Sequence, residues 1–167
     1  IIIIVIVLII AILIGGGLVA YYISNKEKTT PEDIWNQYIS YINEEKYDEM
    51  YEMITDTAKS QISKEDFIKR NENIYSGIDM ANLDIQITNV EEEEKNISKI
   101  NYTETMETSA GNVEFQNTVR IVKNDQREYK IEWSHNLILP GLNSTDKVRV
   151  KTIKAKRGEI DDKNGIM

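Results

Sequence analysis

The fold is decided by the stretch Leu83-Asp84-Ile85-Gln86-Ile87-Thr88, in which apolar and polar residues alternate one by one. This period of two predicts a β-strand with one buried and one solvated face. Before Gly77, the apolar residues instead recur at the helical period of about 3.6 residues. The period therefore changes once along the chain, and we expect helices first and strands afterwards.

Three further segments with strand character follow. They contain Ile100 and Tyr102, the stretch 113–121 and the stretch 129–133. The residues Ala110-Gly111-Asn112 and Lys123-Asn124-Asp125-Gln126 supply turns between strands. We therefore expect an antiparallel meander of four strands.

Three helices are expected before the strands. Thr30-Pro31 gives the first an N-cap and a proline at the first helical position, and apolar residues recur at helical spacing up to Ile42. A second short helix is expected over residues 47–54. A third begins at Ser63, with Asp66 three residues later as in a capping box. Helices grouped before strands give an α+β fold with the helices on one face of the sheet.

Residues 1–23 form an uncharged, apolar run. At about 1.5 Å of rise per residue they reach roughly 34 Å, against a hydrocarbon core of about 30 Å. Tyr21-Tyr22 lies where aromatic side chains favour the membrane surface. We expect an uncleaved transmembrane anchor at 1–23 and a linker at 24–30. The alternative is a cleaved signal peptide ending at Leu18-Val19-Ala20, for which the leucine is bulky.

The composition excludes several classes of site. The chain has 167 residues, no Cys and one His, so it contains no disulfide framework, thiolate metal site or cysteine nucleophile. We expect no cofactor and no metal. The net charge of −8 argues against a nucleic-acid-binding surface, because phosphate contacts need a basic patch. Basic residues concentrate in residues 147–157, which carry six and no acidic residue.

The last forty residues carry two motifs. Residues 133–142 follow the pattern Trp-x-x-x-x-Ile-x-Pro-Gly-Leu, and residues 157–165 follow Arg-Gly-x-Ile-x-Asp-Lys-Asn-Gly. Together they resemble class B penicillin-binding proteins of the methicillin-resistance type. In that family the first motif closes the N-terminal extension and the second opens the pedestal, or dimerisation, module. Lys163 stands where the family usually has Arg, which keeps the charge but removes a planar hydrogen-bonding fork.

The resemblance implies a fold and a set of structural residues. Residues 31–140 would form an NTF2-like (cystatin-like) domain, with three helices packed on a curved four-stranded antiparallel sheet. Residues 141–167 would be a connector and the start of the pedestal module. The matching residues would be structural and not catalytic: Trp133, Pro140, Gly141, Arg157, Gly158, Glu159, Asp162, Asn164 and Gly165.

The family's catalytic apparatus uses a Ser-x-x-Lys nucleophile and a Lys-Thr-Gly strand. Ser60-Gln61-Ile62-Ser63 lacks the Lys, and Lys151-Thr152-Ile153 lacks the Gly. We therefore expect the chain to be a fragment without catalytic motifs. It would be the membrane-proximal part of a peptidoglycan D,D-transpeptidase, which anchors and spaces the catalytic domain for cell-wall cross-linking.

The resemblance also implies a location and partners. We expect a single-pass protein of the cell membrane, with its domain on the extracytoplasmic side. Its partners would be the membrane, through residues 1–23, and the remainder of its own penicillin-binding protein. Peptidoglycan or cell-wall synthesis proteins are further expected partners, and nucleic acid is not.

Two polar features have both a functional and a structural interpretation. His135 could be a general base, but it has no partner in a recognised motif, so we expect a structural hydrogen-bonding role. The run Glu91–Glu94 could bind calcium, but it lacks the alternating oxygens and the Gly turn of a calcium loop. We expect these glutamates in a solvated loop between strands.

Two further features are similarly ambiguous. An aromatic set could line a ligand pocket, but its helical spacing favours a place in the core: Trp35, Tyr38, Tyr41, Tyr47 and Tyr51. The basic run 147–157 could contact an anionic wall polymer or lipid headgroups. The alternation of Val148, Val150 and Ile153 with charged residues favours an extended connector.

Two other functions remain open. A small NTF2-like isomerase or hydratase would need a pocket with two carboxyl groups, at least one with a raised pKa. An interior filled with aromatic and aliphatic side chains would count against it. A free-standing membrane-anchored binding module would fold over residues 24–150.

Overall fold

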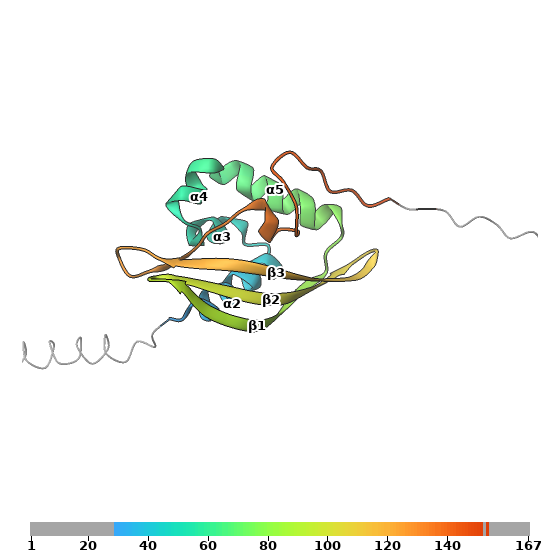
Figure 1. Ribbon diagram of the computed structural model, residues 1–167. Coiled ribbons are helices and arrows are strands. Elements are labelled where there is room, and N and C mark those ends of the chain that lie inside the picture. Colours follow the sequence, from blue (N-terminus) through green and yellow to red (C-terminus); the bar gives the residue numbers. More distant parts are fainter. Residues whose placement is uncertain (1–28, 152, 154–167) are drawn as a thin grey trace, which may run out of the picture.

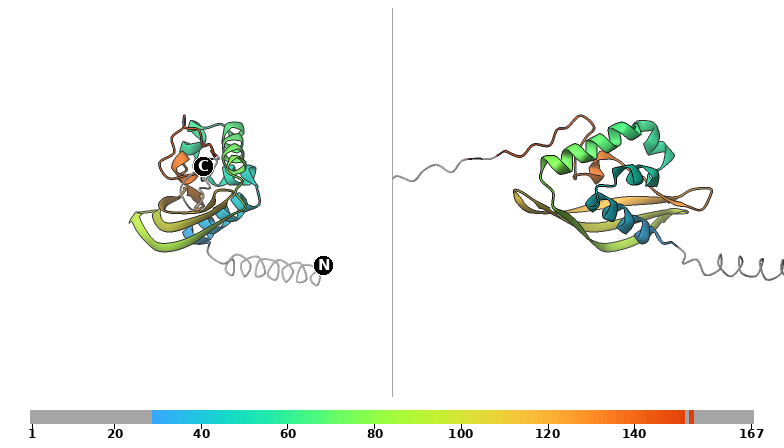
Figure 2. Two further views of the ribbon diagram at one scale, coloured as in Figure 1. Left: turned by 90° about the vertical axis from the view of Figure 1, so that its right-hand side faces the viewer. Right: turned by 180° about the vertical axis from the view of Figure 1, so that it is seen from behind.

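The computed structural model describes residues 29–151 and 153. Four helices precede four strands, and the strands form one antiparallel sheet in the order β1-β2-β3-β4. Figures 1 and 2 show a curved sheet with the helices gathered on one side, as the α+β order predicts. The helices are α2 (Pro31–Asn43), α3 (Tyr47–Met53), α4 (Asp56–Gln61) and α5 (Lys64–Gly77). The strands are β1 (Asn82–Glu94), β2 (Ile97–Thr108), β3 (Gly111–Lys123) and β4 (Tyr129–Ile131).

Over residues 29–151 and 153, the structure has one helix more than the three that the sequence predicts there. This helix, α4, begins after Thr55, whose side-chain oxygen accepts a hydrogen bond from the Ala58 N–H at 3.2 Å. Ala58 is the one buried residue of the helix. Because α4 has no apolar stripe, hydrophobic periodicity gives no signal for it.

Both predicted helix starts with a capping residue are confirmed. The Thr30 hydroxyl accepts from the Asp33 N–H at 3.2 Å, and the Asp33 carboxylate accepts from the Thr30 N–H at 2.8 Å. At the start of α5, the Ser63 hydroxyl accepts from the Asp66 N–H at 3.1 Å. These contacts satisfy amide groups that a helix leaves unpaired at its first turn.

The first strand is longer than its alternating stretch. It continues to Glu94, so the prediction of a loop over Glu91–Glu94 is wrong. Successive side chains of a strand point to opposite faces, and two of the glutamates have cationic neighbours. Glu91 pairs with Lys99 at 3.3 Å, and Glu93 pairs with Arg120 at 2.8 Å. The neighbouring strands thus reduce the repulsion that the four consecutive charges would otherwise produce.

The core lies between the sheet and the helices. Trp35 of α2 is fully buried, and its ring centroid lies 4.9 Å from that of Tyr102 on β2. Tyr38 and Tyr47 are also buried, while Tyr41 and Tyr51 are partly buried against the same cluster. The interpretation of the aromatic set as core is therefore confirmed.

Several expectations concern residues that are not described. The predicted anchor at 1–23, most of the linker at 24–30 and residues 154–167 lie outside the described residues. Within residues 29–151 and 153, no helix has the length and apolar character needed to cross a membrane.

Asn43, the last residue of α2, joins this helix to the edge strand β1. Its Nδ2 donates to the Leu83 carbonyl at 2.8 Å, and its Oδ1 accepts from the Leu83 N–H at 2.8 Å. The amide side chain thus occupies the place of a neighbouring strand at the free edge of the sheet.

Replacing Asn43 by Ala should lower the free energy of unfolding by about 1–2 kcal/mol, because two backbone groups lose their partners. Chemical denaturation of the chain in a non-ionic detergent measures the change. Asn36→Ala is the matched control, since it makes the same substitution at an exposed position of the same helix. Equal stability of the two variants would show that the contacts to Leu83 contribute nothing.

Candidate functional site

The first C-terminal motif begins at Trp133, two residues after β4 ends. Its side chain is 5% exposed. The ring centroid lies 4.9 Å from that of Phe67 on α5 and 4.9 Å from that of His135. The buried indole therefore packs against α5 and holds there the segment of chain that follows the last strand.

Asn136, in the short 3-10 helix η1 (His135–Leu137), links the motif back to the sheet. Its Nδ2 donates to Asn117 Oδ1 at 3.0 Å, and Asn117 Nδ2 donates to the Asn136 carbonyl at 2.9 Å. Asn136 Oδ1 also accepts from the Gly141 N–H at 2.7 Å. One side chain thus joins β3 to the Pro140-Gly141 segment.

Pro140 and Gly141 form a tight turn. The Leu142 N–H donates to the Leu139 carbonyl at 3.0 Å, and Gly141 has a φ of +79°. Pro at the second position and a residue with positive φ at the third are the pattern of a type II turn. A Cβ at position 141 would meet no neighbouring atom, so the backbone conformation is what favours Gly here.

Arg70 of α5 holds the chain after the turn. Its Nη2 donates to the carbonyls of Asn143 at 2.7 Å and Asp146 at 3.0 Å. The Asp146 carboxylate in turn accepts from the backbone N–H and the side chain of Asn143, at 2.8 and 3.1 Å. The bonds from Asn143 lower the pKa of Asp146, with a smaller effect from the Arg70 charge. The connector is therefore attached to α5 over residues 143–146.

The structure brings three of the nine motif residues together. Trp133, Pro140 and Gly141 lie within one folded segment, joined through Asn136. The other six, from Arg157 to Gly165, lie outside the described residues. Sequence reasoning missed Arg70. Its partners Asn143 and Asp146 lie 73 and 76 positions further along the chain, and no local sequence pattern shows contacts over such separations.

His135 is half-buried and rests on the Trp133 ring. Within residues 29–151 and 153, the contact seen for its side chain is packing on Trp133, and the expected hydrogen-bonding role stays a prediction. Burial lowers the pKa of His135, and the positive charge of Arg70 lowers it further.

One expectation about the catalytic motifs also needs correction. Ser144-Thr145-Asp146-Lys147 has the Ser-x-x-Lys spacing. In a helix this spacing places both side chains on one face, but these residues lie in an exposed turn of the connector. The tetrad therefore lacks the helical geometry that would bring the two side chains together.

Glu104 is a site residue that sequence reasoning did not single out. It lies on the inner face of β2, between Ile85 of β1 and Phe115 of β3, and its side chain is 2% exposed. Its Oε1 has no hydrogen-bond partner among the described residues. Burial raises the pKa of Glu104 to about 8, so the carboxyl is mostly neutral at pH 7.

Glu104 alone does not make an acid–base site. Asn71 and Glu104 are the buried polar residues of the described chain, so no second buried carboxyl accompanies Glu104. The space around it is filled by aromatic and aliphatic side chains, including Tyr102 and Met106 on the same strand face. The described residues also contain no cluster of three side chains able to hold a metal ion. The interior thus lacks the pocket with two carboxyl groups that an isomerase or hydratase requires.

Residues 30–146 match the model of the family described as NTF2-like N-terminal transpeptidase domain. Over 142 residues the chain is 34% identical to penicillin-binding protein 3 of Bacillus subtilis (strain 168), which covers 81% of this chain and 21% of that protein. The chain therefore spans about a fifth of the length of this curated relative.

A similar fold occurs in a SEC-C motif containing protein from Psychrobacter arcticus. Its crystal structure matches with a TM-score of 0.50 and 16% sequence identity, covering 77% of this chain and 68% of that one. At this identity the similarity concerns the fold alone.

The contribution of Glu104 to stability should fall as the pH rises from about 4.5 to about 8, because the folded carboxyl keeps a proton that the unfolded chain releases. His135, whose pKa is lowered by burial, contributes in the opposite direction, and this contribution is common to the unchanged chain and its variants. One such proton gives a slope of about 1.4 kcal/mol per pH unit. Glu104→Gln should remove this slope, so that the variant gains most over the unchanged chain at pH 8 and above. Denaturation curves at a series of pH values measure both.

Glu107→Gln is the matched control for this prediction, because it removes an exposed carboxyl from the same strand. It should leave the slope in place. A Glu104→Gln variant with the same pH dependence as the control would show that Glu104 is ionised in the folded protein.

Proposed function

Because the chain belongs to the family of NTF2-like N-terminal transpeptidase domains, as its C-terminal motifs suggest, we propose that it is the non-catalytic, membrane-proximal part of a penicillin-binding protein. In this proposal the chain anchors a peptidoglycan D,D-transpeptidase and spaces its catalytic domain for cell-wall cross-linking. The match to a fifth of penicillin-binding protein 3 of Bacillus subtilis supports the assignment to one part of a larger protein.

The observation that carries the spacer role is the position of the two ends of the described domain. The chain enters beside α2 and leaves past α5, and Figures 1 and 2 show these ends on opposite sides. A domain arranged in this way holds whatever follows it away from whatever precedes it. A domain with adjacent ends would instead return the chain to its starting point.

The attachment of the connector supports the same role. Arg70 binds two connector carbonyls, and Asn136 binds both β3 and the turn at Gly141. These bonds hold the chain over residues 133–146 on a defined path. A spacer transmits its length and direction only if its exit is held in this way.

We assign the anchoring role to residues 1–23, on the basis of their apolar length. The domain would then lie on the extracytoplasmic side of the cell membrane, with its own penicillin-binding protein, peptidoglycan and cell-wall synthesis proteins as partners. Arg157, Gly158, Glu159, Asp162, Asn164 and Gly165 would shape the start of the pedestal module. The nucleophilic serine would lie in another part of the protein.

Fluorescent penicillin should not label this chain, whereas it should label the intact penicillin-binding protein by acylating the catalytic serine. Gel fluorescence after denaturation measures the label. Labelling of the chain that disappears in Ser144→Ala would give the connector tetrad a catalytic role and contradict the proposal.

The orientation is testable because the chain has no cysteine of its own. Lys95→Cys places one thiol in the turn between β1 and β2, at an exposed position. In intact cells a membrane-impermeant maleimide should label this variant and leave the cysteine-free chain unlabelled. Labelling only after the membrane is permeabilised would place the domain in the cytoplasm and overturn the proposed location.

A further inference from the structure

A hollow of about 400 Å³ lies where the connector passes α5. Its lining includes the cations Lys69 and Arg70 of α5, the imidazole of His135 of η1 and the carboxylate of Asp66. Gln61, Asn73 and Ser144 add neutral hydrogen-bonding groups. A second hollow, of about 280 Å³, shares Arg70 and Asn73 and is also lined by Lys147 and Arg149.

The charges around these hollows are unbalanced. Within residues 29–151 and 153, none of Lys69, Arg70, Lys147 and Arg149 pairs with a carboxylate. The two acidic residues on the rims are already hydrogen-bonded. Asp66 accepts from the Ser63 hydroxyl at 2.7 Å, and Asp146 accepts from Asn143. Both carboxylates keep their charge, but the cations Lys69, Arg70, Lys147 and Arg149 outnumber them, so the surface is locally positive on a chain whose net charge is −8.

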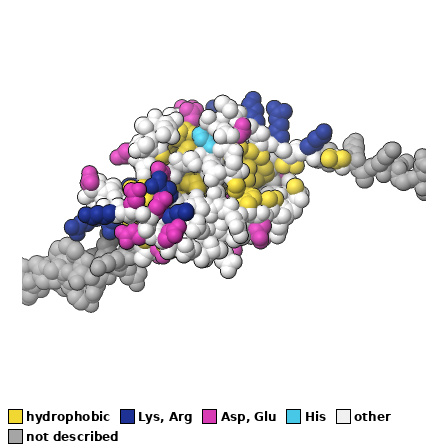
Figure 3. All heavy atoms as spheres, viewed as in Figure 1, with side chains coloured by type: hydrophobic (Ala, Val, Ile, Leu, Met, Phe, Trp, Pro, Cys, Tyr) yellow, Lys and Arg dark blue, Asp and Glu magenta, His cyan; other side chains and the backbone are white. Residues whose placement is uncertain are grey.

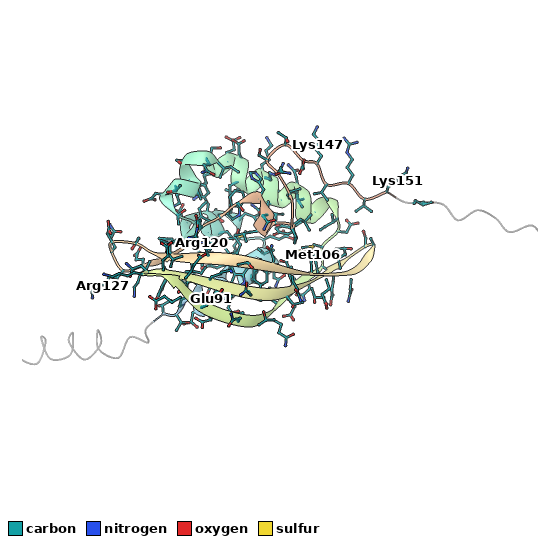
Figure 4. The ribbon with its side chains drawn as sticks, viewed as in Figure 1. Glu91, Met106, Arg120, Arg127, Lys147 and Lys151 are labelled. Atoms are coloured by element: carbon teal, nitrogen blue, oxygen red, sulfur yellow. The ribbon has the colours of Figure 1, made fainter. Side chains whose placement is uncertain are left out.

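At the opposite end of the domain, basic side chains such as Arg120 are paired with carboxylates. Figure 4 places Arg120 and Arg127 there, while Lys147 rises from the connector beside α5. Arg120 is bound by two carboxylates, those of Glu93 at 2.8 Å and Glu132 at 2.6 Å. In Figure 3, basic and acidic side chains are intermixed at that end, whereas basic ones predominate at the upper edge along the connector. The positive surface thus belongs to the connector side.

The guanidinium of Arg70 is held in a fixed position. Its Nη2 is fixed by two backbone carbonyls, and its Nε is buried without a hydrogen-bond partner among the described residues. A guanidinium held in this way loses little conformational freedom when it binds a further acceptor. The acceptor that suits it, with an ammonium and an imidazole nearby, is an oxyanion with several oxygens.

We propose that the hollow between α5 and the connector binds a phosphate group of a soluble ligand, through Lys69, Arg70 and His135. A tetrahedral phosphate offers oxygens in several directions, which matches donors that come from both α5 and η1. A soluble source is favoured because this surface lies on the side of the domain away from its described N-terminal end. The site is independent of the spacer role, which makes no use of these side chains except Arg70.

His135 provides the readout, because it is the one histidine of the chain and its imidazole gives one Cε1–H and one Cδ2–H resonance. The full chain, in maltoside micelles, is titrated from pH 5 to pH 8 in phosphate and in chloride at equal ionic strength. A bound anion stabilises the imidazolium, so phosphate should raise the pKa of His135 by about half a unit or more relative to chloride.

The matched variants are Lys69→Gln and Lys95→Gln, which each remove one exposed lysine. Lys69→Gln should lose most of the phosphate effect, and Lys95→Gln should keep it. Equal titration in phosphate and chloride, or equal loss in both variants, would overturn the proposal.

A third arm of the experiment adds phosphatidylglycerol or phosphatidylcholine to the micelles without free phosphate. An effect seen only with phosphatidylglycerol would assign the site to lipid headgroups and overturn the soluble source.

Discussion

The packing of Trp35 against Tyr102 is the contact on which the rest of the domain depends. It joins the first helix to the middle of the sheet, with ring centroids 4.9 Å apart, and Trp35 also stacks on Tyr38 at 5.3 Å. Both rings of the first pair are almost completely buried. Burial of large aromatic side chains dominates the stability of a small core, so this contact fixes where α2 crosses the sheet. The alternation along β2 then follows, because each inward residue must face that helix layer.

The connector extends the same packing beyond the last strand. Trp133 contacts Phe67 of α5, so the chain that leaves β4 is drawn over the helices. Hydrogen bonds then fix the path of the connector backbone, which side-chain packing alone would define less precisely. Arg70 and Asn136 both bind main-chain groups of the connector, which lie at positions set by the backbone and not by side-chain rotamers. The direction of the exit is therefore a property of the folded domain, since α5 and β3 both hold it.

Local patterns predicted the elements that have local causes. The caps at Thr30 and Ser63 and the strand around Leu83 are visible in a few neighbouring residues, and the structure confirms them. The helix α4 could not be predicted from hydrophobic spacing, because it buries only Ala58. The glutamate run looked like a loop because the cations that permit a strand there, Lys99 and Arg120, stand on other strands. Arg70 and Asn43 act on residues at least 40 positions away, which one sequence without a structure does not show.

The surroundings of Glu104 indicate that the interior of the described domain stabilises the fold and does not form an acid–base site. An ionisable group in an acid–base site needs space for a ligand and a second group to exchange protons with. Glu104 has neither, since its neighbours across the sheet are Ile85 and Phe115 and no other carboxyl is buried in the described chain. A carboxyl in such surroundings avoids the cost of a buried charge by keeping its proton. The interior is therefore filled with packed side chains. The polar and charged groups that can contact a partner lie on the surface of the domain. They are concentrated where the connector crosses α5, and this part of the surface combines a fixed backbone with cations that have no carboxylate partner among the described residues.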